Sequence, residues 1–238
     1  MPALLRAALR PSVASRAVSA AVSPAPRCGH LRSSLASSFS SCAARRESFP
    51  SKLHPGLYYH RTAADQPLLV SYLPQPPPSL TFSPTTIGSL RALKNTQQDG
   101  PPADSGMPPI SPRTLTPNPD FVRLVHEVIA LNIADDAWMQ TQAKAATADT
   151  HIHISDLRQP ADANRVPDAQ DILGSVLVQN QQLVPDSYEP NDVAYRLVTE
   201  AGLIHLPGEL HTRLREACER VFELEKEAAR EEAEMQQQ

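Results

Sequence analysis

The uneven distribution of proline limits what this chain can fold into more than any other feature. Of the 24 prolines in 238 residues, 15 lie between residues 50 and 119. Proline lacks a backbone N–H and disrupts helix interiors, so this region is expected to hold only short strands, edge strands and loops. Any long helix must therefore come from the C-terminal half of the chain.

Three apolar islands interrupt the proline-rich region and predict short β-strands. They lie at residues 57–59, 68–73 and 85–90, and each is bounded by Pro or Gly. We expect the segment 47–93 to add these strands to the sheet of a main domain. Residues 94–117 contain few apolar side chains and are interpreted as a disordered loop.

The region 118–228 carries the patterns of a small α+β domain. Asn118-Pro119-Asp120 is a helix start, and helical apolar spacing predicts a helix over 119–133. The stretch from Trp138 to Ala148 either continues that helix or forms a second, antiparallel one. Alternation predicts a strand over 151–157.

A hairpin and two further helices complete the expected fold. The hairpin spans residues 172–184, and its loop is expected to exceed two residues because Asn-Gln suits a type I′ turn poorly. Helices are predicted over 190–200 and 208–230, followed by a frayed polar tail at 229–238. The predicted class is α+β, with short antiparallel strands, about three or four helices and a long C-terminal helix.

Residues 1–46 have the composition of a mitochondrial transit peptide. They contain seven arginines and ten serines but no lysine, aspartate or glutamate. A secretory signal would need an uninterrupted apolar run, which the recurring arginines prevent. The sequence therefore predicts import into mitochondria, and the matrix is the predicted compartment.

Charge and composition exclude several classes of function. Removal of the seven arginines of residues 1–46 leaves 15 basic and 26 acidic residues, a formal charge of −11, which opposes nucleic-acid binding. No run of about 18 apolar residues is present, so stable membrane insertion is not expected. Glycine-rich phosphate loops and cysteine pairs are absent from the sequence, and no cofactor is predicted.

The C-terminal helix carries a heptad-like apolar seam. Leu210, Leu214, Val221 and Leu224 recur at spacings typical of a helix-packing stripe. The pattern covers fewer than three heptads, so packing on the protein's own core is the favoured interpretation. Alternatively, these four residues bind a partner helix or groove.

A histidine pair is the sharpest chemical signal. His151 and His153 would lie on one face of a strand and could share a metal ion. Known metal sites of this kind stand on barrels of about 250 residues, more than this chain can form. Candidate third ligands are Asp156, Asp162 and Asp168, and their spacing does not single out one of them.

Several segments together resemble an uncharacterised family of fungal mitochondrial proteins. The segments are His54-Pro55-Gly56-Leu57-Tyr58-Tyr59-His60, Thr86-Ile87-Gly88, Pro167-Asp168-x-x-Asp171-Ile172-x-Gly174-Ser175-Val176 and Tyr195-Arg196-Leu197-x-Thr199-x-x-Gly202. The resemblance implies a mitochondrial address and one unit built from residues 52–93 and 118–215. It implies no activity and no functional residues.

Two classes of function remain open from the sequence. The first is a non-catalytic interaction or assembly factor with a protein partner in mitochondria, favoured by the acidic chain and the apolar seam. The alternative is a metal-dependent hydrolase that uses His151 and His153.

Overall fold

The computed structural model describes residues 46–63, 66–78, 83–91, 107–159 and 167–235. All of them belong to one unit that spans residues 42–238. The predicted transit segment lies outside the described residues up to residue 45. The predicted α+β class is confirmed, with short antiparallel strands and a long C-terminal helix.

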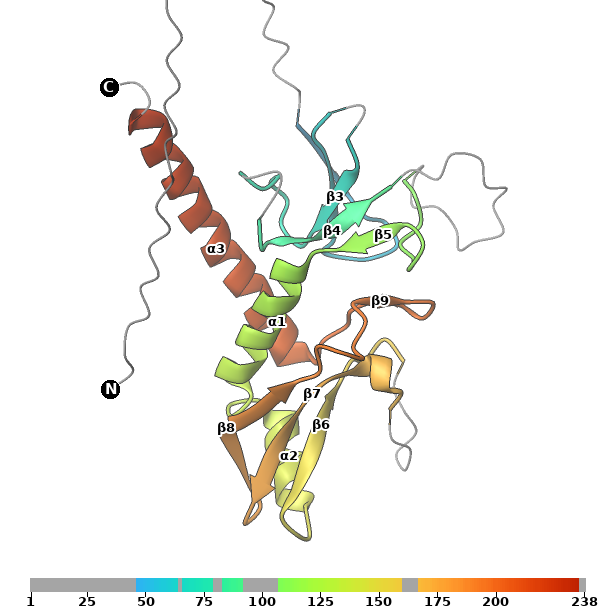
Figure 1. The fold of residues 1–238 in the computed structure, drawn as a ribbon, viewed down its shortest axis with the longest axis vertical. Helices are drawn as coiled ribbons and strands as arrows, with labels where there is room; N and C mark the ends of the chain where they lie inside the picture. The colour runs from blue at the N-terminus through green and yellow to red at the C-terminus, as the bar shows by residue number, and fades with distance from the viewer. Residues whose placement is uncertain (1–45, 64–65, 79–82, 92–106, 160–166, 236–238) are drawn as a thin grey trace, which may run out of the picture. The chain divides into compact units, whose positions relative to one another are not determined.

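The proline-rich region forms a five-stranded antiparallel sheet whose strands follow chain order (Figure 1). The strands are β1 (Glu47–Pro50), β2 (Tyr58–Arg61), β3 (Leu68–Ser71), β4 (Thr86–Leu90) and β5 (Leu115–Pro117). The three apolar islands are confirmed as β2, β3 and β4. Each strand has three to five residues, as expected where proline ends the ladder.

Strand β5 corrects the prediction of a disordered loop over 94–117. Leu115 pairs with Leu90 and is buried, and Gly88 faces Pro117 across the same ladder. A Cβ at Gly88 would come within 2.5 Å of the Thr116 carbonyl oxygen, so only glycine permits this close pairing. Residues 107–117 therefore belong to the fold, while 92–106 lie outside the described residues.

The prediction that the 47–93 strands extend the main domain's sheet is wrong. A separate three-stranded antiparallel sheet is formed by β6 (Thr150–Ser155), β7 (Ile172–Gln179) and β8 (Gln182–Pro190). Strand β4 pairs with β3 on one edge and with β5 on the other, so neither edge is free for a strand of this second sheet. The two sheets instead share one apolar core, to which Val70 and Ile87 contribute from one and Val176 from the other.

Helix α1 (Pro119–Asn132) starts where the sequence predicts. The Asn118 side chain accepts a hydrogen bond from the Asp120 backbone N–H and donates to the carbonyls of Ser83 and Thr86. The cap therefore also fastens the helix to the start of β4. A separate helix α2 (Ala137–Ala145) follows, capped by Asp136, so the two-helix alternative holds.

The hairpin between β7 and β8 turns more tightly than expected. Gln179 pairs with Gln182, and the two residues between them, Asn180 and Gln181, have φ of 51° and 61°. Both lie in the left-handed region that a type I′ turn requires. The expected longer loop is wrong: Val176 and Val178 are both buried on one face of β7, which fixes the register beside the turn.

The predicted helix at 190–200 does not form. Strand β8 runs to Pro190, and a turn leads into a small hairpin of β9 (Val198–Thr199) and β10 (Gly202–Leu203). The Asn191 backbone N–H donates to the Leu173 carbonyl and its side-chain amide to the carbonyls of Ala169 and Ile172, while the Arg196 N–H donates to the Gln170 carbonyl. Pairing across the sheet thus replaces helical pairing.

Helix α3 (Gly208–Met235) is confirmed and is longer than predicted. It packs against α1, and its first four turns bury Leu210, Leu214, Cys218 and Phe222 (Figure 1). The expected frayed tail is wrong over 229–235, which continue the helix; residues 236–238 lie outside the described residues. Among the described helices, none is long and apolar enough to cross a bilayer.

A buried histidine joins three strands of the five-stranded sheet. His60 has 0% exposure, with Nδ1 2.8 Å from Ser48 Oγ and Nε2 2.8 Å from Ser71 Oγ. Ser71 Oγ donates to the Leu73 carbonyl, so we assign the His60 proton to Nε2 and the Ser48 hydroxyl as donor to Nδ1. Burial lowers the His60 pKa to about 4.

This histidine predicts a pH dependence of folding. In the unfolded chain His60 binds a proton near pH 6.5, whereas in the folded protein it does so only near pH 4. Its contribution to the free energy of unfolding is therefore fully present above about pH 6.5 and is lost as the pH drops toward 4. We expect His60→Gln to remove up to about 3 kcal/mol of this acid-dependent loss. Denaturant unfolding across the interval measures it. His151→Gln, at an exposed histidine, should keep the wild-type slope.

Candidate functional site: a groove between helix α1 and the segment after strand β8

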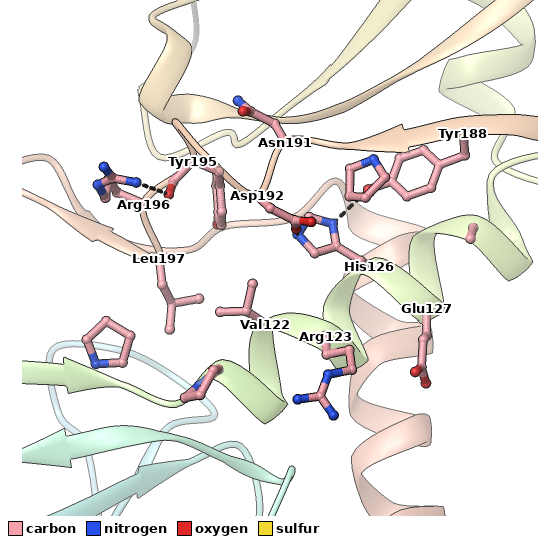
Figure 2. Close-up of a pocket in the computed structure, with 14 residues that line it drawn as sticks. Val122, Arg123, His126, Glu127, Tyr188, Asn191, Asp192, Tyr195, Arg196 and Leu197 are labelled. Atoms are coloured by element: carbon pink, nitrogen blue, oxygen red, sulfur yellow. Dashed lines mark hydrogen bonds and ion pairs between the residues drawn. The ribbon is translucent and has the colours of Figure 1, made fainter. Parts of the chain in front are cut away.

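The described structure contains a groove of about 690 Å³ beside helix α1. Its volume lies in the range of roughly 300–1,000 Å³ that is usual for ligand sites. One wall is the outer face of α1, and the other is the end of β8 with the segment that follows it (Figure 2). The lining residues are Pro117, Pro119, Val122, Arg123, His126, Glu127, Ala130, Tyr188, Pro190, Asn191, Asp192, Tyr195, Arg196 and Leu197.

His126 is the central polar group of the groove. Its side chain is nine-tenths buried, and Nδ1 lies 2.8 Å from the Tyr188 hydroxyl. Nε2 has no hydrogen-bond partner and lies 3.6 Å from the nearer Asp192 carboxylate oxygen (Figure 2). The nearby carboxylate favours a proton on Nε2, so we assign the Tyr188 hydroxyl as the donor to Nδ1.

Burial keeps the side chains of His126 and Tyr188 neutral at physiological pH. Burial lowers the pKa of His126, and the Asp192 carboxylate only partly opposes that effect. Burial, reinforced by the charge of Asp192, raises the pKa of Tyr188. The groove therefore presents a neutral N–H donor at His126 directly beside a carboxylate.

A glycine on the neighbouring strand allows Tyr188 to reach His126. A Cβ at Gly174 would lie 2.7 Å from Tyr188 Cε2 and 2.6 Å from the Glu189 carbonyl oxygen. Any larger residue would push the Tyr188 ring and strand β8 away from β7. The close approach at Gly174 thus sets the position of the hydroxyl that orients His126.

A buried ion cluster holds the wall opposite α1. The Arg158 side chain is 2% exposed and donates to the carbonyls of Arg196 and Leu197 and to Asp171 Oδ1. Asp156 is buried beside it, where its Oδ2 accepts a hydrogen bond from the Tyr195 hydroxyl at 3.2 Å. These bonds fix the backbone that carries the groove residues 195–197.

The cluster contains one cation and two carboxylates. Burial raises the pKa of Asp156, while the backbone N–H and the charge of Arg158 lower it. The Asp156 oxygens also accept from the backbone N–H groups of Arg158 and His205. Every member is hydrogen-bonded, so the cluster serves as a structural clamp and leaves no open position for a ligand.

The charged side chains at the rim of the groove differ in whether an ion pair neutralises them. Arg123 pairs with Asp120 at 2.7 Å, and Arg196 Nη1 donates to the carbonyls of Val193 and Tyr195. Among the described residues, no hydrogen bond or ion pair occupies the Glu127 carboxylate, and Asp192 faces only His126. Backbone carbonyls do not neutralise Arg196, so one unpaired positive charge stands against the two negative charges of Glu127 and Asp192, and the net charge of the rim is negative.

The apolar seam of α3 does not form one exposed surface, which corrects its assignment as a partner site. Leu210 and Leu214 are 1% and 0% exposed and belong to the core, and Val221 packs partly against it. Leu224 is 64% exposed and faces solvent. The first two residues are unavailable to a partner because α3 packs on α1. The favoured interpretation, packing on the protein's own core, describes Leu210 and Leu214.

The histidine pair lies on the solvent side of the three-stranded sheet. His151 and His153 are exposed on β6 and face Leu177 and Ser175 across the ladder. Asp156 is unsuited as third ligand because its oxygens are engaged in the clamp, and Asp168 is exposed before the 3₁₀ turn Ala169–Asp171. Asp162 lies outside the described residues. Within the described chain, no three metal-ligating side chains come together.

Sequence patterns did not indicate the groove. His126 and Tyr188 are 62 residues apart, and the expected helix at 190–200 placed Asp192 in a different structure. The one available signal was the position of His126 away from the centre of the apolar stripe of α1. A polar residue at such a position is common on helices and does not by itself indicate a site.

Comparison of this chain with protein-family models, curated proteins and solved structures finds no match to any of the three.

Proposed function

We propose that the protein is a mitochondrial interaction or assembly factor that binds another protein through the groove beside α1. One observation carries the proposal: His126 turns a buried, unpartnered Nε2 toward a groove with an apolar floor. Buried polar atoms are normally hydrogen-bonded, and an unpaired one at a cavity wall is expected to gain a partner from a ligand.

The groove lining favours binding over catalysis. The described lining holds no serine, threonine, cysteine or lysine to serve as a nucleophile beside His126. The imidazole is held between Tyr188 and Asp192 instead. The exposed pair His151 and His153 gains no support from the structure as a hydrolase centre, because the described residues bring no third ligand to it.

The proposed location rests on the composition of residues 1–46 and on the resemblance to fungal mitochondrial proteins. A fluorescent fusion of the full chain is expected to overlap a matrix marker and to be protected from protease in isolated mitochondria. Deletion of residues 1–46 should leave it in the cytosol. A cytosolic signal from the intact fusion would contradict the proposed location.

A pair of adjacent α1 substitutions tests the proposed binding surface. Ala130 lines the groove, whereas Leu131 is 79% exposed and is not part of its lining. Ala130→Arg places a long side chain in the groove and is expected to reduce co-purification of the partner by roughly tenfold or more. Leu131→Arg should leave it unchanged. Equal recovery with both variants, each folded by circular dichroism, would exclude the groove as the binding surface.

A further inference from the structure

We infer that the groove binds an extended segment of its partner in which an apolar side chain is followed by a lysine or arginine. This inference rests on the proposed function and specifies its ligand. Three features of the groove carry it: its division into apolar and acidic ends, the donor–acceptor pair at its centre, and the imbalance of its rim charges.

The two ends of the groove differ in chemistry. Val122 and Leu197 supply the apolar end (Figure 2). Pro117, which also lines the groove, ends β5 two residues before α1 begins. Glu127 and Tyr188 lie toward the other end, and Asp192 lies beside His126 between the two ends. A segment that spans both ends must place an apolar side chain over Val122 and a different kind of side chain near Asp192.

The centre of the groove matches a peptide unit. His126 Nε2–H is a donor without a partner, and the Asp192 carboxylate 3.6 Å away is an acceptor. Asp192 is 72% exposed, so a ligand can reach its carboxylate from solvent. A backbone carbonyl can accept from His126 while a neighbouring N–H donates to Asp192. Only an extended segment has both groups free, because a helix uses them internally.

Charge complementarity identifies the second side chain. Arg123 is neutralised by Asp120, whereas Arg196 donates only to backbone carbonyls and keeps its charge. That one positive charge is outnumbered by the carboxylates of Glu127 and Asp192. A lysine or arginine of the partner would neutralise these carboxylates, and an acidic residue would be repelled. The formal charge of −11 on residues 47–238 acts in the same direction at longer range.

A peptide library with matched charge reversals tests this inference. Displayed random heptapeptides are selected on the full chain, and the enriched peptide is titrated by fluorescence anisotropy. We expect enrichment of an apolar residue followed by Lys or Arg, and roughly tenfold weaker binding to Asp192→Lys. Asp186→Lys is the control, because Asp186 is exposed on the same strand as Tyr188 but does not line the groove. Exchanging the peptide's basic residue for Glu should restore binding to Asp192→Lys.

Several outcomes would overturn the inference. These are enrichment of peptides without a basic residue, equal loss of affinity in both lysine variants, failure of the exchanged peptide to recover binding, and absence of any enrichment. If no peptide is enriched but Ala130→Arg still abolishes co-purification, the proposed function stands and the partner presents a folded surface. If a peptide binds as expected but Ala130→Arg leaves co-purification unchanged, the proposed function fails.

Discussion

Replacing Arg158 with methionine is expected to lower the free energy of unfolding by about 3–5 kcal/mol. The substitution keeps much of the side-chain length but leaves the carboxylates of Asp156 and Asp171 buried without their cation. It also frees the carbonyls of Arg196 and Leu197 at the groove wall. Against a total stability of about 5–15 kcal/mol, the loss is large and measurable by denaturant unfolding.

A control and a pH comparison identify the cause of that loss. Arg213→Met removes an exposed arginine paired with Glu216 at 3.2 Å, and the expected change is below about 1 kcal/mol. Without Arg158, burial raises the pKa of Asp156 above that of the unfolded chain, so this carboxyl prefers to be protonated in the folded state. The deficit of Arg158→Met should therefore be smaller in mildly acidic buffer than at neutral pH. A deficit independent of pH would assign the loss to packing alone.

Leu214→Ala is expected to cost about 2–5 kcal/mol, whereas Leu224→Ala should change stability by no more than about 0.5 kcal/mol. The two leucines lie on the same helix and repeat the same sequence pattern, but Leu214 is 0% exposed and Leu224 is 64% exposed. Thermal and denaturant unfolding of the two variants measures the difference. Equal losses would mean that α3 packs differently from the fold described.

The elements predicted from sequence are those whose signals are local. Helix α1 begins at Asn118-Pro119 because cap, proline and first-turn aspartate act within three residues. The strands of the proline-rich region are recognisable because Pro and Gly limit each apolar run. Helix α3 is predicted by an apolar stripe that repeats along its own length.

The errors arise where distant groups compete with a local signal. Pro190-Asn191-Asp192 resembles the start of α1, and the Asn191 side chain accepts from the Ala194 N–H as a helix cap would. The Arg196 N–H, however, donates to the distant Gln170 carbonyl, so no helix continues from this turn. In the same way, pairing with Leu90 draws Leu115 into a sheet that its own neighbours do not predict. Tertiary contacts of this kind override local propensity, and no single segment encodes them.

The candidate groove shows the same limit. Its donor lies on α1, the group that orients the donor lies on β8, and the carboxylate follows β8 in a turn. Each residue is ordinary within its own segment. Only the packing of α1 against β8 brings His126, Tyr188 and Asp192 together and forms the groove.

Site-specific photo-crosslinking in intact mitochondria tests the central claim most directly. A photoreactive amino acid is placed at Arg123, an exposed residue of the groove, and separately at Leu131, which lies on α1 away from the groove lining. We predict one discrete crosslinked protein from position 123 and none from position 131. Equal crosslinking from both positions, or none from position 123 in a folded and imported protein, would contradict the assignment of the groove as the partner-binding site.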